Sequence, residues 1–489
     1  MKKYFLISLF VSLIMSCSND NPIIEIEEPK PELNLAPNDF DISIDNISHS
    51  NATITWNQAV DPENDSVTYN IYLNQTLIIE GISELTYQLI DLTELTNYTG
   101  KIIAKDTNNN ETTTTFSFQT EKYYLKYSKI FEYRTEFGGD TYSMIKALDG
   151  NYILTGKSFL NPHFQFFVLK IDPEGNEIWK KFYNYELFDS WLFNIIQINS
   201  GDYFITGEHH VLKLDNEGNE IWYKKIESYD IDDGSSEIKS IKADSNGNLY
   251  LVGGRGSSNS QIYQQAVLTK LDNLGNILWE KIFEPSRRNF FNDLVITSTN
   301  DLIILGSKET SSATDTSQEQ IDFWVVKTNS DGNLIWEKSY GDGKYDFPQK
   351  IIKTNDGNFV FAGYSWGAYD NSDARLIKIG NNGNEIWNST HDPNNLSIFS
   401  VVETSDGGFA STGYNFASDN SLVILKYDNN GNLLWEIMHY EFSVETTGKS
   451  ILQTEDEGYL IAGTNYKKGT LGYPPKIWVI KTDPEGNYE

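Results

Sequence analysis

The 489-residue sequence contains a single cysteine, Cys17. One cysteine excludes an internal disulfide, and it leaves the rest of the chain without a cysteine-based metal site or a cysteine nucleophile. We therefore expect the body of the chain to be stabilised by the size of its hydrophobic core.

Positive charge is also scarce. Lys and Arg number 38 against 69 Asp and Glu, which gives a formal net charge of −31, and the acidic residues are spread along the chain. This balance favours a well-solvated surface and disfavours polyanions as partners. We expect no nucleic-acid partner.

The apolar run at the N-terminus, Tyr4 to Met15, has about a dozen residues, fewer than the roughly 20 that a membrane-spanning helix needs. It follows Lys2 and Lys3, which is the order of a signal peptide over residues 1–16. Leu13-Ile14-Met15-Ser16-Cys17 resembles a bacterial lipobox. The resemblance implies a lipid anchor on Cys17 in the cell envelope. The alternative is an ordinary secretory peptide with a chance cysteine.

Residues 17–38 are rich in proline and charge, as in Glu27-Glu28-Pro29-Lys30-Pro31-Glu32. Such composition favours an extended chain with little packing. We expect a flexible tether here.

Residues 39–120 consist of short alternating runs separated by turn residues, which predicts a sandwich of about seven strands. The order of Trp56, Tyr69, Tyr72 and Tyr98 resembles that of a fibronectin type III domain, with Tyr98 in the place of the tyrosine corner. The resemblance implies a spacer or adhesion module.

Beyond residue 123 one phrase recurs seven times, as in Lys170-Ile-Asp-Pro-Glu-Gly-Asn-Glu-Ile-Trp179. Six copies end in a tryptophan: Trp179, Trp222, Trp279, Trp336, Trp387 and Trp435. A second phrase precedes each copy and ends in Gly156, Gly207, Gly253, Gly306, Gly363, Gly413 or Gly463, so the mean period is about 51 residues. This period, with four strand-like runs per repeat, predicts the blades of a β-propeller, and the tryptophans are expected to fill the space between blades.

The last copy stops at Asn487-Tyr-Glu489 without its outer strand, whereas the first repeat is preceded by an extra strand-like run, Tyr124 to Phe131. Pairing this run with the last repeat would close the ring and remove both sheet edges. The sequence therefore predicts an all-β protein: a fibronectin type III-like sandwich followed, over residues 123–489, by a seven-bladed propeller closed by an N-terminal strand.

The repeated Leu-Asp-x-x-Gly-x-x-x-Trp phrase resembles the repeat of quinoprotein (PQQ)-type propellers. Members of that group include dehydrogenases and a non-catalytic lipoprotein of the outer-membrane assembly machinery. The enzymes resemble one another in having eight blades and a cysteine pair or a calcium-ligand set, which differs from the seven repeats here. The Asp- and Asn-rich turns lack the later bidentate Glu of calcium loops and are explained by hairpin geometry. We expect no cofactor, no metal and no catalytic residue.

Loop length varies on the face that also receives the connections between repeats, and function on repeat scaffolds resides in such variable loops. Acidic and aromatic residues precede the innermost strands there, a combination that suits sugar or peptide ligands. The candidate ligand-binding residues are Asp140, Tyr142, Asp189, Trp191, Phe290, Asp293, Tyr345 and Asp346. As individual residues they also fit turn capping and packing.

Together these features predict a surface-exposed, non-catalytic binding or adhesion lipoprotein of the outer membrane, with a carbohydrate or protein ligand. Two alternatives stay open. One is a periplasmic scaffold lipoprotein for envelope assembly. The other is a propeller glycosidase or lyase, whose acid and base would lie among the many Asp and Glu side chains.

Overall fold

The computed structural model describes residues 33–131, 139–160, 163–183, 194–226, 236–256, 265–283, 288–310, 320–341, 343–367, 372–391, 395–417, 420–439, 444–467 and 475–488. Every regular element within these ranges is a strand, which confirms the all-β class. The described part of the chain contains no helix of the length and hydrophobicity needed to cross a membrane. The chain divides into two compact units, Met1–Tyr123 and Tyr124–Glu489.

The first unit is a sandwich of two sheets. A three-stranded sheet has the order β1 (Ile42–Asp45), β2 (Ala52–Trp56), β5 (Thr86–Leu89). A four-stranded sheet has the order β4 (Thr76–Ile82), β3 (Thr68–Leu73), β6 (Asn97–Lys105), β7 (Glu111–Gln119).

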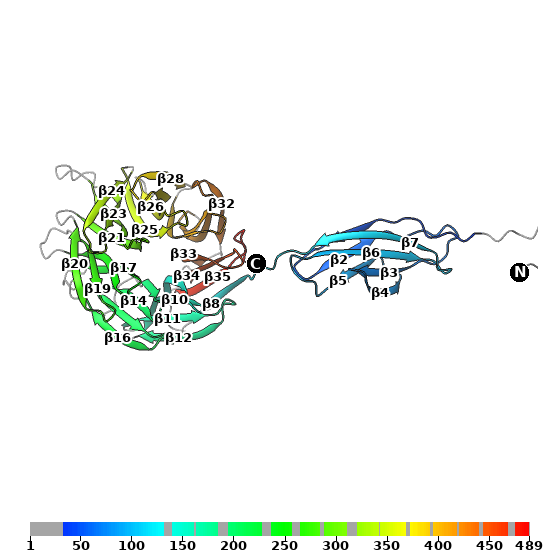
Figure 1. The fold of residues 1–489 in the computed structure, drawn as a ribbon, viewed down its shortest axis with the longest axis horizontal. Coiled ribbons are helices and arrows are strands. Elements are labelled where there is room, and N and C mark those ends of the chain that lie inside the picture. The colour runs from blue at the N-terminus through cyan, green and yellow to red at the C-terminus, as the bar shows by residue number, and fades with distance from the viewer. Residues whose placement is uncertain are drawn as a thin grey trace, which may run out of the picture. The chain divides into compact units, whose positions relative to one another are not determined.

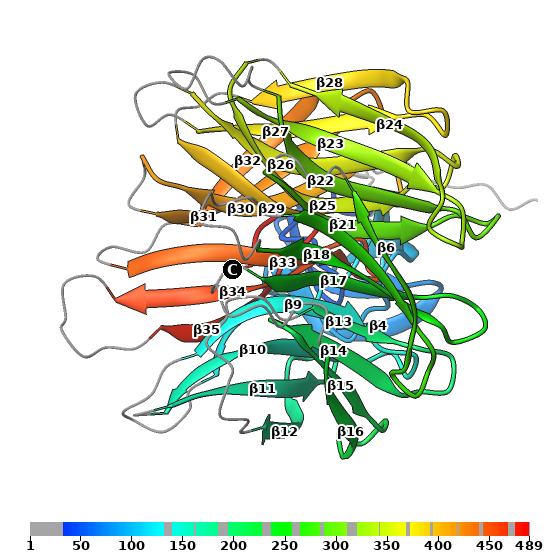
Figure 2. The same cartoon turned by 90° about the vertical axis from the view of Figure 1, so that its left-hand side faces the viewer.

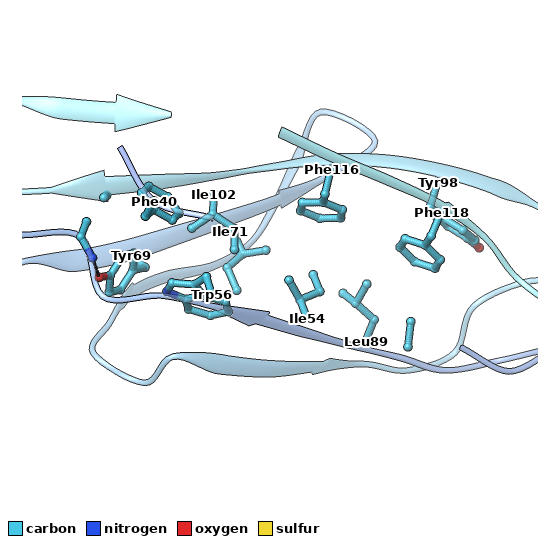
Figure 3. Close-up of a cluster of buried hydrophobic side chains, with 13 residues drawn as sticks. Phe40, Ile54, Trp56, Tyr69, Ile71, Leu89, Tyr98, Ile102, Phe116 and Phe118 are labelled. Atoms are coloured by element: carbon cyan, nitrogen blue, oxygen red, sulfur yellow. Dashed lines mark hydrogen bonds between the residues drawn. The ribbon is translucent and has the colours of Figure 1, made fainter. Parts of the chain in front are cut away.

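Aromatic side chains fill the core of the sandwich (Figure 3). The Trp56 and Tyr69 rings lie 5.4 Å apart, edge to face. Both buried tyrosine hydroxyls accept a backbone hydrogen bond, from the N–H of Ala59 to Tyr69 and from the N–H of Thr93 to Tyr98, each at 2.8 Å. Because a buried hydroxyl is stable only when hydrogen-bonded, these contacts fix the two loops against the core.

The sequence assigns residues 34–38 to the tether, but some of these residues form hydrogen bonds with the sandwich. The Asn34 side chain donates to the Asp106 carboxylate at 2.6 Å, and the N–H of Asn38 donates to the carbonyl of Val60 at 2.9 Å. This part of the predicted tether is therefore held to the sandwich by hydrogen bonds, although Leu35 and Asn38 are exposed.

In the second unit the described strands form seven four-stranded antiparallel groups, two of which share one parallel pairing, Ile321 with Tyr345. In chain order the groups are β9 (Gly139–Lys146), β10 (Tyr152–Leu160), β11 (His163–Ile171), β12 (Glu177–Tyr183); β13 (Asn194–Gln197), β14 (Tyr203–Gly207), β15 (His210–Leu214), β16 (Glu220–Lys225); β17 (Glu237–Ala243), β18 (Leu249–Arg255), β19 (Gln265–Leu271), β20 (Ile277–Phe283); β21 (Asn289–Ile296), β22 (Leu302–Glu309), β23 (Ile321–Thr328), β24 (Leu334–Tyr340); β25 (Tyr345–Lys353), β26 (Phe359–Trp366), β27 (Ser372–Ile379), β28 (Glu385–His391); β29 (Leu396–Glu403), β30 (Phe409–Asn415), β31 (Ser421–Tyr427), β32 (Leu433–His439); and β33 (Val444–Gln453), β34 (Tyr459–Lys467), β35 (Lys476–Lys481) with β8 (Tyr127–Phe131).

The groups are arranged in a closed ring. Each first strand contacts the first strands of both neighbours, in the order β9, β13, β17, β21, β25, β29, β33 and back to β9. Figures 1 and 2 show first strands such as β17 and β33 in the middle and last strands such as β16 and β28 at the periphery. Strand β8 pairs with β35, with Trp478 opposite Ile130, so the run before the first repeat supplies the fourth strand of the last group.

Hydrophobic side chains pack between consecutive groups, as where Val252 and Leu268 meet Leu294 and Ile304. At the periphery each repeat tryptophan lies against a turn glycine of the next group. A Cβ atom on Gly332, for example, would stand 2.8 Å from the Trp279 ring. Tyr127 of β8 takes the corresponding place against Gly175, so the seam is packed like the other interfaces.

The Asp of most outer turns bonds within its own turn. The Asp215 carboxylate accepts hydrogen bonds from the N–H of Glu217 at 3.0 Å and the N–H of Asn219 at 2.7 Å. These hydrogen bonds outweigh burial and lower the pKa of Asp215. Such carboxylates are engaged in shaping the hairpin.

Candidate functional site

Six of the first strands carry a β-bulge, one extra residue that has no partner on the second strand. In the third group Gly253 pairs with Ile238 and Val252 pairs with Ser240, which leaves Lys239 unpaired in the register. The bulge residues are Tyr142, Lys239, Asn292, Gln349, Phe399 and Lys449. A bulge re-aims its side chain relative to a regular strand.

The glycine that ends the second repeated phrase explains the bulge. A Cβ atom on Gly463 would lie 1.9 Å from the carbonyl oxygen of Thr447, which precedes the bulge segment. The corresponding glycines of the other five groups meet a backbone carbonyl at 1.9–2.4 Å. Only glycine permits the second strand to pass this close to the bulged strand.

All six bulge residues line one cavity of about 350 Å³ at the centre of the ring. Each bulge residue precedes its repeat glycine by 14 positions, as Lys449 precedes Gly463. That fixed spacing is the sequence signal that identifies the cavity wall. In the second repeat it points to Phe193, which lies outside the described residues.

The residues that follow five of the bulges also line the cavity. They are Ser143, Asp293, Lys350, Ser400 and Ser450, and Asn194, the first described residue of β13, completes the described lining. The described lining thus contains three lysines (Lys239, Lys350 and Lys449) and one carboxylate, Asp293, among amides, hydroxyls and two aromatic rings.

Asp293 is almost fully enclosed, with 2% of the residue exposed. Its oxygens lie 3.5 Å from the Lys242 ammonium and 3.4 Å from that of Lys350. They also accept hydrogen bonds from the Ser240 hydroxyl at 2.6 Å and the N–H of Ile351 at 3.1 Å. Burial alone would raise the pKa of Asp293, but the two lysines and these hydrogen bonds bring it to about 2. The carboxylate therefore ties three neighbouring groups of the ring together.

Lys239, Lys242 and Lys449 are half-buried, and their ammonium groups lose part of their hydration. Burial lowers the pKa of Lys242 to about 8, against the attraction of Asp293 and helped by the repulsion of Lys350. Burial also lowers the pKa of Lys239, which pairs with Glu237. It lowers the pKa of Lys449 as well, since Asp140 attracts this ammonium only in part.

Two of the ligand-binding residues predicted from the sequence, Tyr142 and Asp293, lie in the cavity wall. Asp140 lies on the same strand as Tyr142, and burial raises its pKa against the attraction of Lys449. Burial, followed by the charge of Asp140, raises the pKa of Tyr142.

Asp346 does not line the cavity and interacts instead with residues of its own sheet. Only 1% of this residue is exposed, its carboxylate accepts a hydrogen bond from the Ser365 hydroxyl, and it lies 3.9 Å from the Arg375 guanidinium. Phe290, opposite Ser307, and Tyr345, opposite Trp366, are half-buried and are not part of the cavity lining. Asp189 and Trp191 lie outside the described residues. Sequence reasoning missed the other described residues of the lining, which are Ser143, Asn194, Lys239, Asn292, Gln349, Lys350, Phe399, Ser400, Lys449 and Ser450.

No group of three or more His, Cys, Asp or Glu side chains in the described ranges is arranged to hold a metal ion. A second hollow, of about 750 Å³, lies on the β3-β6-β7 face of the sandwich. Its wall holds one charged side chain, Lys101, whose ammonium lies 4.7 Å from the centre of the Tyr72 ring. It offers less varied polar chemistry than the central cavity.

No protein-family model matches the chain, and no curated protein matches it. Among solved structures, a protein of unknown function from Bacteroides caccae is 11% identical over 56% of this chain and 90% of its own, with a TM-score of 0.37. A glucose dehydrogenase is 9% identical over 59% of this chain and 95% of its own, with a TM-score of 0.38. A gluconolactonase from Xanthomonas campestris is 11% identical over 71% of this chain and 95% of its own, with a TM-score of 0.35. At these TM-scores the likenesses carry no argument about this chain.

Proposed function

We propose that this chain is a non-catalytic binding lipoprotein of the bacterial cell envelope whose ligand enters the central cavity of the ring. The observation that supports this is the convergence of six bulge residues on one cavity. Bulges occur where a side chain must be re-aimed, and six chemically varied side chains at one structural position form a recognition surface.

The cavity size favours a small ligand or the end of a larger one. Its volume of about 350 Å³ lies at the lower end of ligand pockets, which span roughly 300–1,000 Å³. The Asn292 Oδ1 atom is buried and accepts no hydrogen bond from the described residues, so a ligand hydroxyl could satisfy it. The amides, the hydroxyls and the ring of Tyr142 suit a sugar better than a folded protein surface.

The arrangement favours binding over hydrolysis. Most glycosidases need two carboxylates flanking the scissile bond. Asp293 is the one carboxylate in the described lining, and its pKa of about 2 makes it unsuited to donate a proton near neutrality.

A glycan array tests this function. Residues 18–489 should retain at least one glycan, and Asn292→Trp should lose it because the indole fills the cavity. The matched control is Asn430→Trp, which changes an exposed turn residue that is absent from the cavity lining. Equal binding by wild type and both variants would place the ligand outside the cavity, and an empty array would count against a glycan ligand.

We further propose that Cys17 carries the lipid anchor and that the sandwich, a fibronectin type III-like module, is the spacer between the anchor and a surface-exposed ring. The Tyr98 hydroxyl, bonded to the N–H of Thr93, supports the comparison with a tyrosine corner. Protease treatment of intact cells should release the ring from the surface. Protection until the outer membrane is permeabilised would favour the periplasmic scaffold instead.

A further inference from the structure

The described lining of the central cavity carries more positive than negative side chains, whereas the chain as a whole is acidic. The chain carries a formal net charge of −31, whereas three lysines and one carboxylate line the cavity. Long lysine side chains ordinarily extend into water, because burying an ammonium group is unfavourable unless it is paired. Here they come from β17, β25 and β33, three separate strands of the ring.

The available carboxylates do not balance these lysines evenly. Asp293 is shared by Lys242 and Lys350, and Glu237 pairs with Lys239. Lys449 is held differently: its ammonium lies 4.0 Å from the centre of the Phe399 ring, and Asp140 attracts it without forming an ion pair with it among the described residues. The attraction of a cation to an aromatic ring is weak compared with the hydration that a buried ammonium group loses, so it replaces only part of that hydration.

Partial burial raises the free-energy cost of an ammonium group that has too little counter-charge. Loss of solvation lowers the pKa of Lys449 despite the attraction of Asp140, and it lowers the pKa of Lys239 despite the ion pair with Glu237, so a further negative charge would stabilise both ammonium groups. An anion entering the cavity would supply that counter-charge without moving the strands. Hydroxyls of Ser143 and Ser450 and the amide of Asn292 are available in the wall for its neutral polar groups.

We infer that the central cavity binds a small hydroxylated organic anion, a sugar bearing a carboxylate or a phosphate, with Lys449 as the main contact for its charge and Lys239 as a second. This inference rests on the proposed binding function and specifies its ligand class. A charged group bound in a partly desolvated site by an ammonium forms a stronger hydrogen bond than a neutral group does.

Calorimetric titration of residues 18–489 with glucuronate, glucose 6-phosphate and glucose tests the inference. At least one of the two acids should bind ten or more times more tightly than glucose. Lys449→Met should weaken that binding at least tenfold, and Lys449→Arg should restore most of it. Lys353→Met is the matched control, since Lys353 lies on strand β25 of the same ring, is exposed and is absent from the lining. It should bind as wild type does.

The two acids distinguish the possible sources of the charge. Preference for glucuronate assigns a carboxylated sugar, and preference for glucose 6-phosphate assigns a phosphorylated one. If neither acid binds more tightly than glucose, or if Lys449→Met binds the acid as wild type does, the inference is wrong. The binding function would still stand if a neutral glycan were retained on the array and lost with Asn292→Trp. Melting curves of each variant exclude misfolding as the cause of a loss.

Discussion

The outermost strands of the ring repeat their side chains from group to group, whereas the innermost strands differ at the residue that faces the cavity. Six outer strands place a tryptophan against a turn glycine of the next group. The six bulge residues, by contrast, are one tyrosine, one phenylalanine, one asparagine, one glutamine and two lysines. Each group must pack against the next with the same geometry, so the same tryptophan and glycine contact recurs at the interfaces. The residues of the cavity wall do not make this contact, and they are therefore free to vary with the ligand.

This difference separates two kinds of sequence information. Residues that repeat identically report the fold, and residues that vary at a fixed distance from a repeated glycine report the binding surface. If this distinction is right, substitutions at the two kinds of position should differ in what they damage.

The largest effect is expected at the repeat glycine. Gly463→Ala would place a Cβ atom 1.9 Å from the carbonyl oxygen of Thr447, so backbone must move. We expect a loss of more than about 3 kcal/mol in the free energy of unfolding of the ring, measured by denaturant titration. Gly357→Ala is the control: its φ is +81° and its Cβ would meet no atom within 4 Å. It should cost about 1–2 kcal/mol. Similar losses for both variants would contradict the close-approach explanation.

A smaller loss is expected at a peripheral tryptophan. Trp279→Ala removes the ring that covers Gly332 and should lower the free energy of unfolding by about 2 kcal/mol, since the side chain is only partly buried. Leu278→Ala, one residue away and 52% exposed, should change it by less than about 0.5 kcal/mol. Neither variant should alter ligand affinity. A change in affinity for Trp279→Ala would mean that the periphery and the cavity are coupled.

The periphery should also contain an acid-sensitive interface. Burial lowers the pKa of His439 to about 4, although a hydrogen bond to the backbone of Gly486 opposes the shift. The unfolded chain, with a histidine pKa near 6.5, then binds more protons than the folded one between about pH 4 and 6.5. Stability should therefore fall as the pH is lowered through this window, by the order of 2 kcal/mol from this residue.

Tyrosine occupies the corresponding position in two other groups, where the hydroxyls of Tyr183 and Tyr340 donate to the carbonyls of Gly218 and Gly383 at 2.5 Å. His439→Tyr should thus keep the contact and remove this part of the pH dependence. The difference in melting temperature between variant and wild type should be the same at pH 8 and pH 7. It should grow as the pH is lowered toward 4. Parallel curves down to pH 4 would show that His439 is not the sensitive group.

The sequence was sufficient to predict the features that depend on repetition. The period, the tryptophans and the run from Tyr124 to Phe131 can all be recognised without knowing which strands pair. The cavity wall was not recognised in this way. Its 14-residue spacing from the repeat glycine is present in the sequence, but the spacing acquires a meaning only when the partner strand shows that the residue is a bulge and faces the cavity. Asp346 illustrates a second limit: its partner Arg375 lies on another strand, and the pairing is a property of the folded sheet.

The smallest effect on stability, and of opposite sign, is expected in the cavity wall. Lys449→Met removes an ammonium whose burial is only partly compensated, so the variant should be as stable as wild type or more stable, by up to about 1 kcal/mol near neutral pH. Because burial lowers the pKa of Lys449 in the folded state, the unfolded chain binds more protons above that pKa. Wild-type stability should therefore recover as the pH rises toward the ordinary lysine pKa of about 10.4, and the advantage of the variant should shrink. Denaturant titrations of both proteins at pH 7 and pH 10 measure this difference. If Lys449→Met is less stable than wild type at pH 7, Lys449 stabilises the fold. If the variant is more stable and no longer binds the anion, Lys449 is retained for binding at the expense of stability.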